Sequence, residues 1–118
     1  MVNFIEGGVT APAGFQAAGV HCGIRKNRSK KDLGLIVSDR PASAAAVYTR
    51  NLVKGAPLTV TAAHLADGTA RAVVCNSGIA NTCAFDGIEK AEGMCRLTAQ
   101  TLGLQEEDVL VASTGVIG

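Results

Sequence analysis

The sequence predicts an α/β fold, built as one unit over residues 1–118. Three observations predict this class: an amphipathic helical pattern covers residues 87–102, a β-rich run covers residues 70–75, and an apolar run covers residues 109–112. No internal repeat, low-complexity tract or linker divides the chain. We therefore expect a single layered arrangement of strands and helices.

The first third of the chain predicts a turn-rich segment followed by strands. Residues 7–15 are dense in turn-forming residues, and the alternating run at 18–25 suits a short strand. A basic stretch then precedes the apolar run 33–37, which fits a charged hairpin connection between two strands. After a turn at residues 39–41 we expect a further strand at 45–49.

A short helix is predicted next, at residues 58–65. Pro57 stands where a first helical turn tolerates proline, and Gly68 stands just past the end, after Asp67. The β-rich run 70–75 follows, and we expect it to stop at a polar turn, Asn76-Ser77-Gly78.

The clearest local signal is the helix at residues 87–102. Its apolar residues recur at helical spacing, and Gly103 is a natural left-handed stop. Asp86 stands three residues before Glu89, which predicts a pair like a capping box. After an acidic turn, the apolar run 109–112 leads to the polar segment that ends the sequence.

Bulk composition excludes several classes of function. With 11 Lys+Arg against 10 Asp+Glu, the net charge of +1 lacks the basic excess that nucleic-acid binding needs. No apolar run approaches the roughly 20 residues of a membrane span, and the first residues do not resemble a signal peptide. We expect a cytoplasmic chain without membrane or nucleic-acid partners, and its 4 cysteines as reduced thiols.

Small residues dominate the sequence. It has 14 Gly against only 3 Phe and 1 Tyr, and small side chains bury little apolar area each at about 25 cal/mol per Å². A chain of this kind can form only a small hydrophobic core, so we expect its stability to depend on a partner surface.

Two polar segments are candidates for chemistry. In Ser113-Thr114-Gly115, a hydroxyl and a glycine N–H follow an apolar strand, and two such donors can form an oxyanion hole. The alternative is an ordinary strand-ending turn. Residues 76–81, Asn-Ser-Gly-Ile-Ala-Asn, could orient a polar substrate, or simply form a turn that starts a helix.

The remaining reactive side chains suggest no metal site. His21, expected in mid-strand, and His64 have no ligand partner at zinc spacing. We expect the cysteines to be small buried hydrophobes, with Cys22 the least certain because it lies near basic residues. The basic stretch Arg25 to Lys31 either forms a solvated hairpin or attracts an anionic group, such as a carboxylate or a phosphate of coenzyme A. No nucleotide-binding glycine fingerprint is present.

Five separated motifs together carry a family resemblance, in the same order as in that family. They are Gly8-Val9-Thr10-Ala11-Pro12-Ala13-Gly14-Phe15, Ala18-Gly19-Val20-His21-Cys22-Gly23-Ile24-Arg25, Ala46-Val47-Tyr48-Thr49-Arg50-Asn51 with Ala56-Pro57, Asn76-Ser77-Gly78-Ile79-Ala80-Asn81, and Ser113-Thr114-Gly115-Val116-Ile117-Gly118. Across nearly its whole length the chain resembles the ornithine acetyltransferase family of arginine biosynthesis, also called glutamate N-acetyltransferase.

The resemblance implies a self-processing enzyme with an N-terminal nucleophile. Such a precursor cleaves itself before a threonine, giving an α chain and a β chain whose new N-terminal Thr accepts the acyl group with its own α-amine as base. It implies ping-pong transfer of acetyl from N-acetylornithine to glutamate, releasing ornithine, in an α2β2 assembly without a resident cofactor. Some members of the family also accept acetyl-CoA as donor.

By motif match, the resemblance gives oxyanion-hole roles to Thr114, through its side chain, and to Gly115, through its backbone N–H. This chain departs from the family at Ile79, where Asn is common, which removes a polar group from that loop. The family's α chain continues well beyond Thr-Gly-Val-Ile-Gly, and the cleavage-site Thr is not among these residues. The resemblance therefore implies an N-terminal part of the α chain, with the sandwich-like α/β fold incomplete and the chain inactive by itself.

Two alternatives remain at the level of sequence. A related acyltransferase could use a different acyl group or amino acid, since nothing in these residues reads a substrate side chain. A non-catalytic α/β domain could use the same glycine-rich turns only for packing against another subunit.

Overall fold

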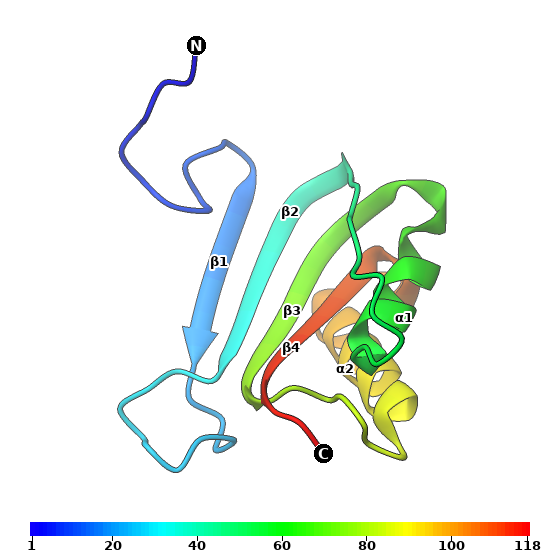
Figure 1. The fold of residues 1–118 in the computed structure, drawn as a ribbon. Coiled ribbons are helices and arrows are strands. Elements are labelled where there is room, and N and C mark those ends of the chain that lie inside the picture. The colour runs from blue at the N-terminus through cyan, green and yellow to red at the C-terminus, as the bar shows by residue number, and fades with distance from the viewer.

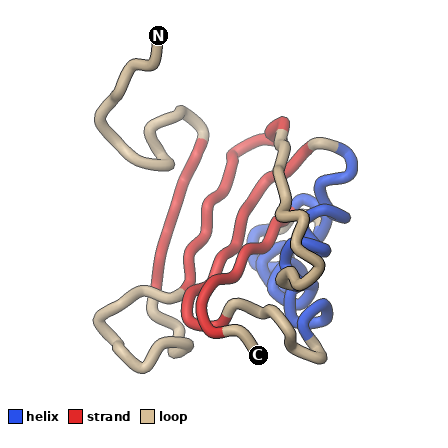
Figure 2. Tube along the Cα trace, in the orientation of Figure 1, coloured by secondary structure: helices blue, strands red, loops and turns tan.

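Two helices pack on one face of a four-stranded sheet, at the β3 and β4 end, in the computed structural model, which describes residues 1–118 (Figures 1 and 2). The strands lie side by side in chain order: β1 (Phe15–Val20), β2 (Leu33–Ser43), β3 (Thr69–Ile79) and β4 (Val109–Val116). Strand β2 is antiparallel to both β1 and β3, and β3 and β4 are parallel. The predicted α/β class is confirmed.

Strands β1 and β2 form the predicted hairpin, joined by residues 21–32. Their register runs from Phe15 opposite Ser38 to Val20 opposite Leu33. The predicted bounds of β1, residues 18–25, are wrong because the strand starts earlier and ends at Val20. His21 therefore lies just after β1 and not in the middle of a strand.

Strand β2 is longer than predicted and absorbs the expected turn at residues 39–41. Its register with β3 shifts between Val37 and Ala42, an irregularity that accommodates Pro41, which has no N–H to donate. The predicted strand at 45–49 is wrong. Val47 is almost fully exposed there, and no strand of this chain lies beside it to pair with.

The predicted short helix is confirmed as α1 (Ala56–His64), with Pro57 in its first turn. A single 3-10 turn, Leu65–Asp67, continues it to Gly68, which adopts a left-handed φ of 76°. The Thr61 hydroxyl donates to the Val111 carbonyl (2.7 Å) and accepts from the Val111 N–H (3.0 Å). These two bonds fix α1 along the outer edge of β4.

Helix α2 (Gly87–Leu102) has the predicted bounds and ends at Gly103, whose φ is 67°. The predicted capping pair is wrong, because the Asp86 side chain makes no capping hydrogen bond and instead lies 3.6 Å from the Lys90 ammonium. The Asn81 amide donates to the Gly87 carbonyl at 2.8 Å, so Asn81 holds the start of α2 instead.

The core lies between the helices and one face of β3 and β4. Its buried residues are Val60, Ala72, Val74, Ala91, Cys95, Ala99, Val109 and Val111. Alanine and cysteine on α2 let this helix approach the sheet closely. Burial, with Glu106 and Glu92 as smaller causes, raises the pKa of the Cys95 thiol to about 11.

The opposite face of the sheet carries no helix, and we call it the open face. Alternation along the strands and the strand register place Ile36, Val73, Cys75 and Leu110 side by side on it. Only 14 of 118 residues are buried: the helices cover β3 and β4 on one side of the sheet, and no helix covers the other, apolar side. None of the helices is long and apolar enough to cross a membrane.

Candidate active site

The two polar segments singled out in the sequence lie next to each other. Strands β3 and β4 continue past the predicted stops, so that Asn76 pairs with Ser113, Ser77 with Thr114, and Gly78 with Gly115. The predictions of polar turns at residues 76–78 and 113–115 are therefore wrong. Each segment is extended because the other supplies its partner, about 4.8 Å away.

Glycine is required where these strands meet. A Cβ on Gly115 would lie 2.5 Å from the Gly78 carbonyl oxygen and 2.6 Å from the Ile79 nitrogen. Gly115 has a φ of 134° and Gly78 a φ of 119°, values that L-residues with a side chain rarely adopt. The two glycines thus let the ends of β3 and β4 approach and turn together.

Gly115 presents its N–H at the outer edge of β4. Successive residues of a strand direct their N–H groups to opposite sides, and the Val111 N–H points away from β3, toward Thr61. Gly115 lies four residues further along and has the same orientation. Thr114 is exposed and its side chain lies on the open face, so a hydroxyl donor and an N–H donor follow each other directly in the chain at the end of β4.

A cavity of about 340 Å³ opens on the sheet at this point. Ser77 and Thr114 line it together with residues of β2 and of the 21–32 loop, among them Lys31 and Asp32. On the helix side of the same strands, the Ser113 hydroxyl donates to the Asn76 side-chain oxygen at 2.5 Å, and the Asn76 amide donates to the Ile79 carbonyl at 2.9 Å. Buried Asn76 therefore fastens the two strand ends to each other.

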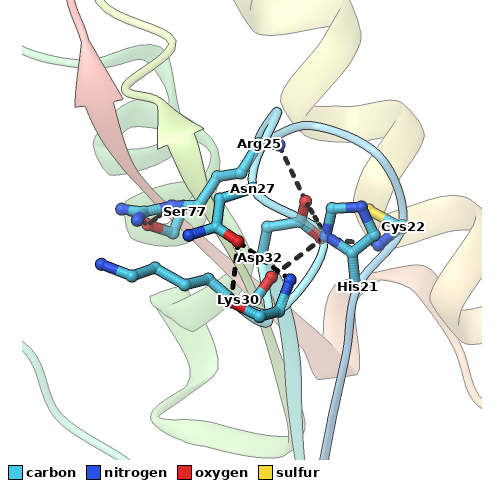
Figure 3. Close-up of polar contacts among 8 residues, drawn as sticks. His21, Cys22, Arg25, Asn27, Lys30, Asp32 and Ser77 are labelled. Atoms are coloured by element: carbon cyan, nitrogen blue, oxygen red, sulfur yellow. Dashed lines mark hydrogen bonds and ion pairs between the residues drawn. The ribbon is translucent and has the colours of Figure 1, made fainter.

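The loop of residues 21–32 is organised around one buried carboxylate, that of Asp32 (Figure 3). The two carboxylate oxygens accept the N–H groups of Cys22 (2.6 Å) and Arg25 (2.8 Å). These hydrogen bonds, the Arg25 N–H first, hold the pKa of Asp32 far below its usual value. His21 Nδ1 lies 3.0 Å from the Lys30 carbonyl oxygen and 3.2 Å from the carboxylate, so this nitrogen carries a proton.

Arg25 extends from this loop to the strand ends. Its Nε and Nη2 groups both donate to the Ser77 hydroxyl oxygen, at 3.2 and 2.7 Å (Figure 3). Ile24 and Arg25 also pack over Gly78, where a Cβ would lie 2.8 Å from Ile24 Cγ2. The basic loop is therefore not only a solvated hairpin, since Arg25 lies against the residue that pairs with Thr114.

Comparison with known proteins shows the family to which the chain belongs. The sequence matches the ArgJ family over residues 16–118. The chain belongs to the ArgJ family. It is 48% identical over 118 residues to the arginine biosynthesis bifunctional protein ArgJ of Caldanaerobacter subterraneus subsp. tengcongensis, covering 99% of this chain and 29% of that protein. It is 50% identical over 116 residues to the ArgJ protein of Bacillus subtilis, covering 97% of this chain and 28% of that protein.

Solved ArgJ structures have the same fold. The ArgJ protein of Bacillus halodurans superposes with a TM-score of 0.90 at 47% identity, covering 95% of this chain and 59% of that one. Ornithine acetyltransferase of Mycobacterium tuberculosis, complexed with ornithine, superposes with a TM-score of 0.87 at 42% identity. The match covers 94% of this chain and 61% of that one. The predicted family is confirmed, and this chain spans less than a third of the length of those two curated ArgJ relatives.

The other candidate residues of this ArgJ chain lie elsewhere. His64 Nδ1 is 2.8 Å from the Val109 carbonyl, a contact that anchors α1. Cys95 is buried as expected, but Cys22 and Cys83 are exposed, so the expectation of four buried cysteines is wrong for these two. Desolvation of the thiol by the surrounding loop, followed by its hydrogen bond to the Asp32 carboxylate and that group's charge, raises the pKa of Cys22, which opposes a nucleophilic role. No three potential metal ligands cluster in the chain.

Sequence reasoning missed the link from Asp32 through Arg25 to Ser77. The sequence does show an acidic residue directly after the basic stretch, at the start of the apolar run 33–37. That signal marks the end of a hairpin loop, but it does not show that the carboxylate turns inward and accepts hydrogen bonds from backbone N–H groups.

Proposed function

We propose that this chain is the N-terminal part of the α chain of an ArgJ acetyltransferase that moves acetyl from N-acetylornithine to glutamate. The observation that carries the proposal is the position of Thr114 and Gly115. In a chain of the ArgJ family, two hydrogen-bond donors lie together where a close pair of parallel strands ends. The solved relative complexed with ornithine supports an amino acid of this kind as the substrate.

The proposed reaction proceeds through an acyl-enzyme. A threonine outside residues 1–118, the N-terminal residue of the β chain, attacks the acetyl carbonyl carbon while its α-amine takes the hydroxyl proton. The carbonyl oxygen becomes an oxyanion and accepts hydrogen bonds from the Thr114 hydroxyl and the Gly115 N–H. The C–N bond then breaks, and ornithine leaves with the proton.

Glutamate completes the cycle. Its amine attacks the acetyl-threonine ester, the same two donors stabilise the second oxyanion, and the threonine oxygen leaves and regains its proton. Acetyl-CoA fits the same acylation step as an alternative donor, with the thiol as leaving group. No resident cofactor is needed for either step.

The remainder of the ArgJ polypeptide covers the open face in this proposal. That face presents apolar side chains without any cover from the chain's own helices, and the two curated relatives described above are more than three times as long as this chain. The covering partner is the rest of the α chain with the β chain, in an α2β2 assembly.

Initial-rate kinetics test the proposed function. The complete enzyme, this chain with the ArgJ remainder, is assayed with N-acetylornithine and glutamate, and also with a panel of other N-acyl amino acids. We expect parallel double-reciprocal plots, as ping-pong transfer requires, and the highest kcat/KM for N-acetylornithine. Intersecting plots would contradict an acyl-enzyme, and preference for another acyl amino acid would favour the related-acyltransferase alternative.

A reconstitution experiment addresses the non-catalytic alternative. The chain is mixed with the remainder of the ArgJ polypeptide, including the Thr-initiated β chain, and acetyl transfer is measured before and after mixing. We expect transfer only after mixing. A chain that stays monomeric and inactive beside a folded partner would favour a packing domain instead.

A further inference from the structure

The Ser77 hydroxyl accepts two hydrogen bonds but donates none. A serine hydroxyl has two acceptor lone pairs and one proton to donate. Two N–H groups of Arg25 point at the Ser77 oxygen, at 3.2 and 2.7 Å, which uses its accepting capacity. No group in the chain accepts the Ser77 proton, and no carboxylate pairs with Arg25. The proton is therefore free to point away from Arg25.

Thr114 is the residue placed to accept that proton. Ser77 and Thr114 are directly paired in the register of β3 and β4, so their side chains lie on the same face, about 4.8 Å apart at the backbone. Both line the 340 Å³ cavity. Two hydroxyl groups at that separation reach hydrogen-bond distance by rotation about their Cα–Cβ bonds.

We propose that Ser77, held by Arg25, is a positioning residue that donates its proton to the Thr114 hydroxyl oxygen and thereby directs the Thr114 proton toward the substrate oxyanion. The chain of donors runs from the Arg25 guanidinium to Ser77, then to Thr114, and ends on the substrate. Each hydrogen bond polarises the next, and the cation at the far end makes Thr114 a stronger donor. This inference rests on the proposed function, because it gives Thr114 the oxyanion role.

The loop makes this arrangement rigid. Asp32 binds the Arg25 N–H at 2.8 Å, and the Asp32 carbonyl accepts the Ser77 N–H at 2.9 Å. The same residue thus fixes both partners of the Arg25–Ser77 contact. Arg25 reaches Ser77 from a defined backbone position, as a positioning group requires.

The test is a double-mutant cycle in the complete enzyme. Ser77→Ala removes the donor and is expected to lower kcat by about 10-fold, with KM unchanged, because the interaction acts only in the transition state. Thr114→Ala lowers kcat further. In the Thr114→Ala background, Ser77→Ala is expected to have less than about a twofold effect, because Ser77 then has nothing to orient.

Matched variants separate this role from a structural one. Ser77→Thr keeps a hydroxyl on a strand and should retain kcat within about twofold. Ser77→Cys keeps the size but donates weakly, and should fall like Ser77→Ala even if the alanine variant folds poorly. Arg25→Gln should lower kcat less than Ser77→Ala. Lys90→Gln removes an exposed charge contact on α2, 3.6 Å from Asp86, and should leave kcat unchanged.

The outcomes distinguish the two proposals. If Thr114→Ala lowers kcat and Ser77→Ala does not, the positioning role of Ser77 is wrong and the proposed function stands. If Ser77→Ala costs the same in both backgrounds, Ser77 acts structurally and the inference is overturned. If the wild-type complete enzyme transfers no acetyl group, the proposed function itself fails.

Discussion

At the scale of single residues, the contact between Gly78 and Gly115 sets how closely β3 and β4 approach. Neither position has room for a Cβ, and both have a positive φ. The close approach brings Ser77 beside Thr114 and leaves the Gly115 N–H at the strand edge. A glycine pair at this point is therefore a condition for the donor arrangement and not only for the fold.

Substitution of Gly115 by alanine should destabilise the protein. The new Cβ meets backbone atoms, which cannot move aside, so we expect a loss of about 3 kcal/mol or more in the free energy of unfolding. Calorimetric unfolding of the complete enzyme measures it. As a control, Gly93→Ala in α2 places its Cβ 3.6 Å from Arg96 Nη2, an ordinary contact, and should stabilise by about 0.5–1 kcal/mol. Equal stability of Gly115→Ala and wild type would contradict the steric account.

At the scale of elements, the loop 21–32 depends on an ionised Asp32. An Asp32→Asn variant has one acceptor oxygen instead of two, and its NH₂ group faces a backbone donor at Cys22 or Arg25. We expect lower stability at pH 7 and faster amide hydrogen exchange through residues 21–32. The exposed Glu107→Gln, with no polar partner, should change neither.

The pH dependence of this effect has a definite sign. Because the pKa of Asp32 is lowered in the folded state, its carboxylate stabilises the fold fully above the usual aspartate value of about 3.9, and the contribution falls as pH drops below it. The difference in melting temperature between wild type and Asp32→Asn should be constant from pH 5 to 8 and shrink below about pH 4. A difference that instead grows on acidification would contradict the assignment.

The bounds of the long helix were predictable from the sequence, whereas the bounds of the strands were predictable only in part. Helix α2 has the bounds that its own apolar spacing and Gly103 indicate, because a helix bonds within itself. The ends of β3 and β4 could not be predicted in this way. Residues 76–79 become strand only by pairing with residues 113–116, which lie 37 positions further along the chain. The site was only partly predictable for the same reason. The sequence indicated Thr114 as a candidate residue, but it did not indicate that Ser77 lies beside it.

At the scale of the whole molecule, the sheet has one covered face and one open face. The small core follows from the sequence, since alanine, glycine and valine bury little area each. Sequence alone predicted dependence on a partner surface but could not indicate which surface, because that requires knowing the side of the sheet to which both helices pack. The structure shows that the face without helices carries Ile36, Val73 and Leu110, and we propose this face as the partner surface.

A charge on the open face should prevent assembly. Ile36→Lys places an ammonium group where the ArgJ remainder is proposed to pack, and a buried unpaired charge is strongly unfavourable. We expect loss of the complete enzyme in size-exclusion chromatography with light scattering, whereas Gln100→Lys on the exposed side of α2 should assemble normally. Normal assembly and activity of Ile36→Lys would show that this face stays in contact with water.

The central claim is that this chain supplies the oxyanion hole of an acetyltransferase, and the kcat of Thr114 variants in the complete enzyme tests it most directly. We predict that Thr114→Ala lowers kcat for acetyl transfer, and the rate of self-cleavage, by about 10²-fold or more, while Thr114→Ser retains most of both. Unchanged rates in both assays for Thr114→Ala would contradict the assignment of Thr114 and with it the account of the site.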